Sequence, residues 1–131
     1  ISQQCGPISR SSAIYETAAW GKEDQPAFLN QVLIIHTVLD PVKLMAVILE
    51  IEQQMGRLRK EKNGERNIDI DIITYGKTHY RSSDLVIPHP QAANRAFVIV
   101  PWYFMDENAE LPGTGKIEKL AHIYLDQVKL K

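Results

Sequence analysis

The amino-acid sequence predicts an α+β fold, in which an antiparallel or mixed sheet is flanked by helices. The prediction depends on two kinds of periodicity and on long connections between the expected strands. Strand-like patterns occupy residues 8–17, 28–39 and 68–72, and helical spacing of apolar residues occupies 41–56 and 117–128. With 131 residues, 44% of them hydrophobic, the chain is long enough for one domain with a sizeable core. We therefore expect a single domain over residues 1–131.

The first forty residues are expected to supply two strands. Residues 1–5 look like the end of a helix that Gly6 and Pro7 stop. Residues 8–17 are rich in Ser, Ile, Tyr and Thr, which favours a strand. Residues 28–39 are rich in Val, Ile and Leu and short of polar breaks, so they indicate a well-buried central strand.

The most regular helix pattern follows these strands. Asp40 can cap the helix, Pro41 suits its first position, and the pattern runs to Gly56. The apolar residues at helical spacing are Leu44, Val47, Ile48, Ile51 and Met55. Residues 57–66 then hold five basic side chains, one glycine and no apolar periodicity, which predicts an exposed basic loop.

The last third of the chain has weaker patterns. Residues 91–105 are largely apolar but contain Pro101, which limits a continuous helix, so we expect short helical turns there. The other expected elements are a turn at 75–77, a short return strand from His79, irregular chain at 82–90, a loop at 106–115 and an amphipathic helix at 117–128.

The composition argues against several classes of function. Fifteen basic and sixteen acidic residues give a formal net charge of -1, so no global field draws the protein to nucleic acid or to an anionic membrane. No apolar run approaches the length that spans a bilayer, and the N-terminus lacks a signal pattern. The single Cys5 rules out an internal disulfide and fits a reducing compartment, so we expect a cytoplasmic protein.

Residues 62–73 carry the clearest chemical signal. Alternation through residues 68–72 places the isoleucines on one face of a strand and both Asp69 and Asp71 on the other, roughly 6.5 Å apart along the chain. Their mutual repulsion favours a compensating cation, and a divalent metal with oxygen ligands is the natural candidate. Because a basic loop leads directly into this pair, the combination suits phosphoryl transfer with Mg²⁺.

Each signal also has a simpler interpretation. Taken alone, the paired-aspartate pattern more often marks a strand with a solvent-facing polar side. His89 could be a surface turn residue, Glu52 an exposed helix residue, and Phe28 and Phe97 core residues. The order of the signals along the chain is what favours a functional interpretation.

Several short motifs occur in a fixed order along the chain. They are Tyr15-Glu16-Thr17, Asp24 to Asn30, Ile51-Glu52 with Gly56-Arg57-Leu58-Arg59, Gly64 to Asp71, Ile87-Pro88-His89-Pro90 and Asn94-Arg95-Ala96-Phe97-Val98. Together they resemble the 6-hydroxymethyl-7,8-dihydropterin pyrophosphokinase (HPPK) family over nearly the whole chain. The Arg-x-x-Asp-x-Asp spacing, followed by two aliphatic residues, is specific to that family.

The resemblance implies a ferredoxin-like α+β fold and transfer of pyrophosphate from ATP to the pterin hydroxymethyl group, with release of AMP, in folate biosynthesis. It implies that Asp69 and Asp71 hold two Mg²⁺ ions that bridge the ATP phosphates. The implied partners are ATP and 6-hydroxymethyl-7,8-dihydropterin, without nucleic acid or membrane, and we expect a monomer.

The resemblance also assigns the other residues of the site. Arg57 and Arg66 would act with the aspartates in catalysis by contacting phosphates. The residues around ATP would be Glu52, Arg59, Arg66, Ile72, His89 and Arg95. The pterin ring would lie between Phe28 and Phe97, and Thr17 and Asn30 would bond its polar edge. A flat heterocycle bound by aromatic faces and a few placed polar groups fits these residue types.

Three departures from the family pattern stand out. Where the family commonly has Trp-Gly-Pro-Arg, this chain has Asn63-Gly64-Glu65-Arg66, so we expect looser closure over the site. The family's proline two residues after Thr17 is replaced by Ala19. The family's first strand, its Gly-Ser-Asn-Leu-Gly turn and most of a helix do not appear before Ile1, so we expect the given sequence to be N-terminally incomplete and its sheet to lack that strand.

Two other classes of function remain open. Another metal-dependent phosphotransferase or nucleotidyltransferase could use the same aspartates, but it would release ADP or pyrophosphate instead of AMP, and Phe28, Asn30 and Phe97 argue against it. A non-catalytic ferredoxin-like module could contact nucleic acid through the basic loop. Such a module would need an exposed aromatic sheet face, whereas residues 28–39 are expected to be buried.

Overall fold

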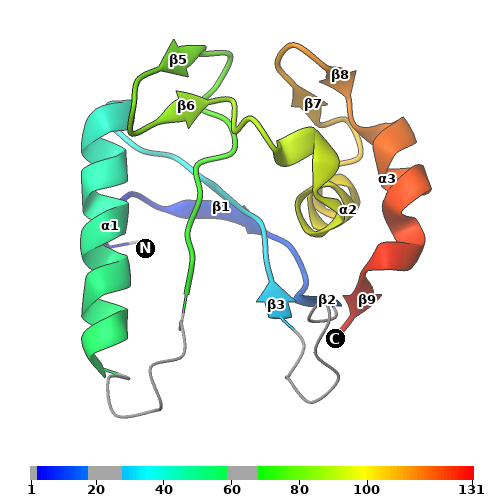
Figure 1. Ribbon diagram of the computed structural model, residues 1–131, viewed down its shortest axis with the longest axis horizontal. Coiled ribbons are helices and arrows are strands. Elements are labelled where there is room, and N and C mark those ends of the chain that lie inside the picture. Colours follow the sequence, from blue (N-terminus) through cyan, green and yellow to red (C-terminus); the bar gives the residue numbers. More distant parts are fainter. Residues whose placement is uncertain (1–2, 18–27, 59–67) are drawn as a thin grey trace.

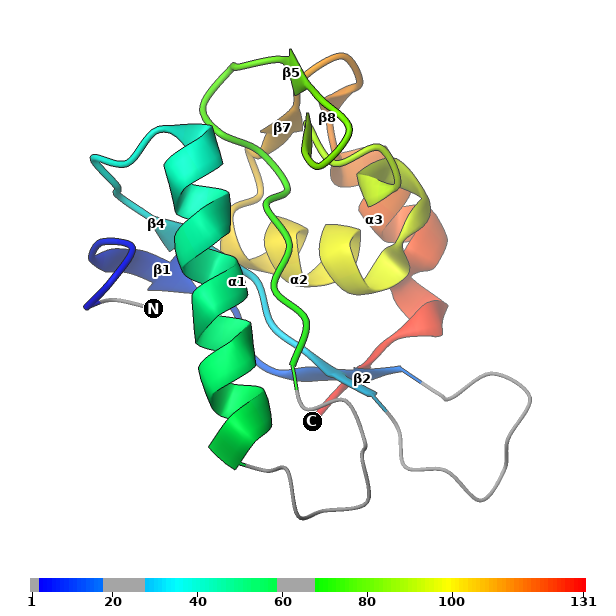
Figure 2. The ribbon, with the colours of Figure 1, turned by 60° about the vertical axis from the view of Figure 1, so that its left-hand side comes forward.

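The computed structural model of the protein has a mixed α+β fold (Figure 1; Figure 2). It describes residues 3–17, 28–58 and 68–131. Helix α1 (Pro41–Leu58) stands at one side of the molecule, α3 (Glu118–Tyr124) at the other, and α2 (Ala96–Met105) lies between them. The predicted α+β class is therefore confirmed. None of the helices in the described ranges is long and apolar enough to cross a membrane.

Four short strands near the N-terminus form antiparallel pairs. They are β1 (Ile8–Ser11), β2 (Tyr15–Thr17), β3 (Phe28–Asn30) and β4 (Leu33–Ile35). Strand β1 pairs with β4, and β2 pairs with β3. Between these pairs, the Ser12 N–H donates to the Val32 carbonyl oxygen over 2.8 Å, and the Ser12 Oγ accepts from the Val32 N–H over 2.9 Å. The strand predicted at residues 8–17 is thus two strands, because the buried Ser12 side chain takes over part of the ladder.

The prediction of a well-buried central strand at residues 28–39 is wrong. The segment divides into β3 and β4, and Phe28 and Leu29 are 58% and 53% exposed. In the part of the chain that the structure describes, β3 is an edge strand of the sheet β3-β2-β9, in which β9 is Lys129–Leu130. Apolar composition does not tell whether a second layer covers both faces of a strand. Because the Phe28 ring is exposed, burial of residues 28–39 no longer argues against a nucleic-acid-binding module.

Helix α1 begins where the sequence predicts. The Asp40 Oδ1 accepts a hydrogen bond from the Lys43 N–H over 2.9 Å, which is the N-cap arrangement. The helix ends at Leu58, two residues beyond the predicted Gly56. Its buried face belongs to a core cluster whose fully buried members are Cys5, Leu44, Ile48, Ile51, Ile72, Leu85 and Ile87. The residues that follow the basic stretch are therefore packed against α1 through Ile72.

Residues 68–72 run beside α1 without pairing to any strand in the described part of the chain (Figure 1; Figure 2). The predicted strand is therefore not formed there. The predicted alternation nevertheless holds, since Ile72 is buried, Ile70 is half-buried, and both Asp69 and Asp71 are exposed. The Ile70 N–H bonds to a side chain of α1 instead of to a neighbouring strand.

Two small hairpins, two helices and two 3₁₀ turns make up the rest. The hairpins are β5 (Tyr80–Arg81) with β6 (Val86–Ile87) and β7 (Glu110–Leu111) with β8 (Gly115–Lys116). The 3₁₀ turns are η1 (Ala92–Asn94) and η2 (Leu125–Gln127). The Thr78 N–H donates to the Tyr75 carbonyl oxygen over 3.0 Å, which confirms the predicted turn. The predicted C-terminal helix is also confirmed, as α3 followed by η2.

Four predictions of local structure are wrong. Residues 3–5 form a turn instead of the end of a helix. The predicted loop at 106–115 and the irregular chain at 82–90 include strands of the two hairpins. Residues 96–105 form one helix that contains Pro101. Proline removes one hydrogen bond from a helix, but α2 lies in the core with its Ile99, Val100 and Trp102 side chains buried, and this packing offsets the loss.

Candidate active site

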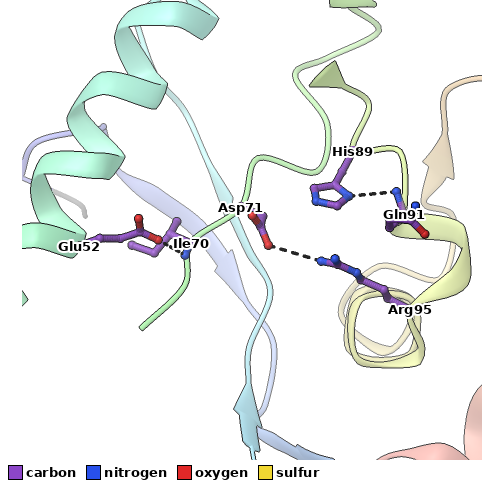
Figure 3. A network of polar contacts seen from close by, with 6 residues as sticks. All are labelled: Glu52, Ile70, Asp71, His89, Gln91 and Arg95. Atoms are coloured by element: carbon purple, nitrogen blue, oxygen red, sulfur yellow. Dashed lines mark hydrogen bonds and ion pairs between the residues drawn. The ribbon is translucent and has the colours of Figure 1, made fainter. Parts of the chain in front are cut away.

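The paired aspartates lie on a segment that is held between α1 and the start of α2 (Figure 3). On one side, the Ile70 N–H donates to the Glu52 Oε2 over 2.6 Å. On the other, the Arg95 Nη1 lies 3.6 Å from the Asp71 Oδ2. These side chains come from three separate parts of the sequence, so the fold brings them together.

Asp69 and Asp71 remain exposed because their neighbours face the core. Ile72 is 7% exposed in the α1 cluster, and Ile70 packs at the edge of that cluster. Burial of the isoleucines fixes the parity of the segment, so both carboxylates lie on the opposite parity. The two aspartates that the sequence predicts as metal ligands therefore share the accessible side.

Arg95 is the residue that begins α2. It occupies the N-cap position with an extended backbone, at φ -112° and ψ 106°. Its guanidinium pairs with Asp71, and its Cζ lies 5.6 Å from the centroid of the Phe97 ring. The side chains of Arg95 and Asp71 are 33% and 47% exposed, so this ion pair adds less than about 1 kcal/mol to stability. Its main effect is to orient the carboxylate and the guanidinium toward the same space.

His89 lies two residues after β6, close to Asp71 and Arg95 (Figure 3). Its backbone N–H donates to the Ile73 carbonyl oxygen over 2.9 Å, and its Nδ1 accepts from the Gln91 N–H over 3.1 Å. Burial lowers the pKa of His89 below its usual 6.5, the positive charge of Arg95 lowers it further, and Asp71 opposes both effects. At neutral pH the imidazole is therefore neutral, and its Nε2–H can donate to a ligand.

A pocket of about 220 Å³ opens beside these residues. Asp71, Ile72 and His89 line it together with residues from α1 and from the β5–β6 hairpin. The remaining lining residues are Met45, Ser83, Asp84, Leu85, Val86 and Pro90. Three residues that the sequence predicts around one nucleotide or its metal thus share one pocket.

A second group of predicted residues lies on β2 and β3. The Asn30 Nδ2 donates to the Thr17 Oγ1 over 3.2 Å. Phe28 is the antiparallel partner of Thr17 in the strand register and presents an exposed ring. Phe97 is half-buried at the edge of the α2–α3 core, and it makes no ring-to-ring contact with Phe28. The structure therefore joins Thr17, Asn30 and Phe28, while Phe97 belongs with Arg95.

The structure does not describe the side chains of the arginines that are predicted to contact phosphate. Arg57 lies in the last turn of α1, and its side chain is outside the described part of the structure. Arg59 and Arg66 lie outside the described residues, as do the departures at Ala19, Asn63 and Glu65. Their predicted contacts with phosphate stay predictions.

The carboxylates suit a metal only in combination with a ligand. Among the described residues, no three His, Cys, Asp or Glu side chains gather closely enough to hold an ion. Mg²⁺ is typically bound by one or two carboxylates together with substrate phosphates. Asp69 and Asp71 fit that donor set. Among the described residues, they do not form a metal site made entirely of protein ligands.

Sequence reasoning missed two features of the site. The first is the role of the hairpin, whose residues 83–86 wall the pocket although the region is predicted as irregular. The apolar run from Leu85 to Ile87 before a proline is a signal that could have located this strand. The second is the bond between Glu52 and Ile70, for which the sequence carries no signal because it joins residues 18 positions apart.

Comparisons with a family model and with known proteins point to the same enzyme family. A family model described as 7,8-dihydro-6-hydroxymethylpterin-pyrophosphokinase (HPPK) matches residues 1–107. The protein named 2-amino-4-hydroxy-6-hydroxymethyldihydropteridine pyrophosphokinase in Haemophilus influenzae is 36% identical over 121 residues, which cover 92% of this chain and 76% of that protein. The protein of the same name in Methylorubrum extorquens is 44% identical over 112 residues, or 86% of this chain and 71% of that protein.

Some relatives are much longer than this chain. The Folate synthesis bifunctional protein, mitochondrial, of Pisum sativum is 43% identical over 94 residues, which cover 72% of this chain but only 18% of that protein. Other curated relatives are named only as the pyrophosphokinase, and the matched region spans between 55 and 76% of their length. The chain therefore corresponds to part of the length of each.

Proposed function

Because this chain belongs to the 7,8-dihydro-6-hydroxymethylpterin-pyrophosphokinase family, we propose that it transfers pyrophosphate from ATP to the hydroxymethyl group of 6-hydroxymethyl-7,8-dihydropterin and releases AMP. The reaction would be a step of folate biosynthesis. The observation that carries the proposal is the meeting of Asp71, Ile72 and His89 at one pocket, with Arg95 paired to Asp71.

The nucleotide is proposed to lie along this pocket. Ile72 offers an apolar surface, and the neutral His89 offers an Nε2–H donor. The guanidinium of Arg95 can bind phosphate oxygens through paired N–H donors. Ile72 and His89 support this placement, because they line the same pocket as residues of the β5–β6 hairpin.

Asp69 and Asp71 are proposed to hold the Mg²⁺ that accompanies ATP, with two ions expected. When bound, the ions would neutralise the phosphates and make the β-phosphorus a better electrophile for the pterin hydroxyl. The exposed carboxylates can attract the metal, and the nearby guanidinium of Arg95 can attract the phosphates. Arg57, Arg59 and Arg66 are proposed to contact the phosphates as well.

The pterin is proposed to bind over β2 and β3. Thr17 and Asn30, already bonded to each other, carry the hydroxyl and amide that a pterin edge requires. The exposed Phe28 ring offers one aromatic face, and Phe97 would offer the other. Phe28 is the cross-strand partner of Thr17, so an exposed aromatic face and two polar side chains are available to one ligand.

The finer description of the protein is also a proposal. We propose a ferredoxin-like sheet in one domain. The antiparallel pairing of β2 with both β3 and β9 supports such a sheet. The protein is proposed to act as a cytoplasmic monomer, without nucleic acid or membrane, and the small net charge of -1 agrees with this.

The test is to incubate the protein with ATP, Mg²⁺ and 6-hydroxymethyl-7,8-dihydropterin and to identify the nucleotide product by chromatography. The proposal expects AMP, formed only when the pterin is present. Release of ADP or of free pyrophosphate would instead assign another phosphotransferase or a nucleotidyltransferase. A parallel reaction without Mg²⁺ should form no AMP, because the charge on the phosphates would be uncompensated.

A further inference from the structure

The bond between Glu52 and Ile70 is the shortest of the hydrogen bonds described above for the candidate site. The Ile70 N–H and the Glu52 Oε2 are 2.6 Å apart, and the donor belongs to the one residue that separates the two aspartates (Figure 3). A charged acceptor makes such a bond about twice as strong as a neutral one. Glu52 is half-buried on α1, so water competes only partly for its carboxylate.

In the described part of the structure, contacts with other elements hold the aspartate segment. There, residues 68–72 pair with no strand, and the Ile70 N–H bonds to a side chain of α1. Packing of Ile70 and Ile72 sets which side chains face the core. Packing alone does not fix the chain along its own direction, which requires directional bonds.

Two directional contacts reach this segment from opposite sides. Glu52 binds the backbone at Ile70 from α1, and Arg95 binds the side chain of Asp71 from the start of α2 (Figure 3). A third contact, from the His89 N–H to the Ile73 carbonyl oxygen, follows at the end of the segment. The Glu52 bond acts on the backbone of the residue that separates the two aspartates.

Glu52 is poorly placed to be a metal ligand. No group of three acidic or histidine side chains forms among the described residues, so Glu52 does not complete a metal site with Asp69 and Asp71. Its Oε2 already accepts the Ile70 N–H, whereas the aspartates lie on the parity that faces away from the core. A direct contact of Glu52 with ATP would have to use the other carboxylate oxygen, Oε1, while Oε2 keeps its bond to Ile70.

We propose that Glu52 is a positioning residue, whose carboxylate holds the backbone between Asp69 and Asp71 so that both carboxylates meet one metal–nucleotide complex. This inference rests on the proposed function for its catalytic meaning, but the contact itself can be tested without any substrate. Metal and catalytic geometries tolerate errors of about 0.5 Å, so a loosened segment should weaken the site without unfolding the protein.

The test compares Glu52→Ala, which removes the acceptor, with Glu52→Gln, which keeps an oxygen acceptor but loses the charge. Glu50→Ala is the matched control, because Glu50 is an exposed carboxylate on the same helix. Two quantities are measured on the full chain. They are the hydrogen-exchange protection of the Ile70 amide without ligands and the Mg²⁺ concentration that gives half-maximal activity with ATP and pterin.

For Glu52→Ala, we expect Ile70 protection to fall roughly tenfold or more and the Mg²⁺ requirement to rise by a similar factor. Glu52→Gln should keep both quantities within roughly threefold of the original protein, and Glu50→Ala should change neither. The KM for the pterin should stay constant, since the proposed pterin residues lie on β2, β3 and α2 and none of them belongs to the Glu52–Ile70 contact.

Two results would overturn the proposal. If Ile70 protection is unchanged in Glu52→Ala, the bond does not hold the segment. If Glu52→Gln raises the Mg²⁺ requirement as much as Glu52→Ala while protection is kept, the charge of Glu52 acts directly on metal or nucleotide. Absence of activity in the original protein would contradict the proposed function alone, and the exchange measurement would still decide the contact.

Discussion

The nucleotide half and the pterin half of the candidate site are built in different ways. The nucleotide half joins Glu52, Asp71, Ile72, His89 and Arg95 through contacts between residues far apart in the sequence, above a buried core. The pterin half places its three residues on two adjacent strands, with little burial around them. Tertiary packing positions the side chains of the nucleotide half, whereas strand register positions those of the pterin half.

This difference predicts how substitutions behave. Exposed residues of either half can be changed at little cost in stability, because few buried contacts depend on them. Changes in the nucleotide half should alter the chemical step, since its groups are proposed to surround the reacting phosphates. Changes in the pterin half should alter the KM for one substrate only.

The largest effect is expected for the aspartates. Asp71→Ala should lower kcat by a factor on the order of 10²–10³ or more, because a group that stabilises the charge of the transition state is lost. Asp69→Ala should lower kcat by a similar factor. The free energy of unfolding should fall by less than about 1 kcal/mol in Asp71→Ala, since its pair with Arg95 is largely exposed.

Steady-state kinetics and thermal unfolding check this prediction. Asp126→Ala is the control, because Asp126 is an exposed carboxylate in η2 outside both halves of the site. Near-normal turnover in either aspartate variant would show that the metal assignment is wrong.

Phe28→Ala tests the pterin half. The ring is 58% exposed, so its loss should change stability little but should raise the KM for the pterin roughly ten- to a hundredfold. The KM for ATP should not change. Leu29→Ala is the matched control, since Leu29 is 53% exposed but lies on the other face of β3. Equal effects of the two substitutions would mean that β3 has no specific pterin face.

Asn30→Ala should have a smaller effect on the same KM, roughly three- to tenfold, because it removes one hydrogen-bonding group that Thr17 orients. Thr17→Ser keeps the hydroxyl that bonds Asn30 and should stay close to the original value. Competition binding with a pterin analogue measures both variants. An increase confined to the KM for ATP would contradict the placement of these residues.

The smallest effect concerns His89 and the pH dependence of stability. Because the folded protein lowers the pKa of His89 below 6.5, the unfolded chain takes up its proton first as the pH falls. The stability that neutral His89 contributes is present above pH 6.5 and is lost as the pH falls through the folded pKa. His89→Gln should therefore flatten the fall in Tm between pH 7 and 5, and the exposed His122→Gln should not. Parallel curves for His89→Gln and the original protein would exclude this linkage.

Local signals predicted part of the fold. Asp40 and the spacing of Leu44, Ile48 and Ile51 located α1, because capping and amphipathic burial are encoded within a few turns. The parity of Asp69 and Asp71 was also predicted, since alternation depends only on which side faces the core. The strand at residues 68–72 was not found among the described residues, because strand pairing requires a partner from elsewhere in the chain.

Tertiary context explains the other differences. Phe28 and Leu29 have the composition of a buried strand, yet β3 lies at an edge in the described part of the sheet. Pro101 argues against a helix locally, but packing in the α2 core overrides it. The residues of the site were predicted through ordered motifs. The contacts of Glu52 with Ile70 and of His89 with Gln91 required the folded geometry.

The most direct test of the central claim follows both transferred phosphates. ATP labelled separately at the β- and γ-phosphorus is incubated with Mg²⁺ and 6-hydroxymethyl-7,8-dihydropterin, and the label in the pterin product is counted. We expect both labels to reach the pterin in equal amounts, with one AMP formed per product. We also expect Asp71→Ala to abolish the transfer and Asp126→Ala to leave it intact. Transfer of the γ label alone, with release of ADP, would contradict it.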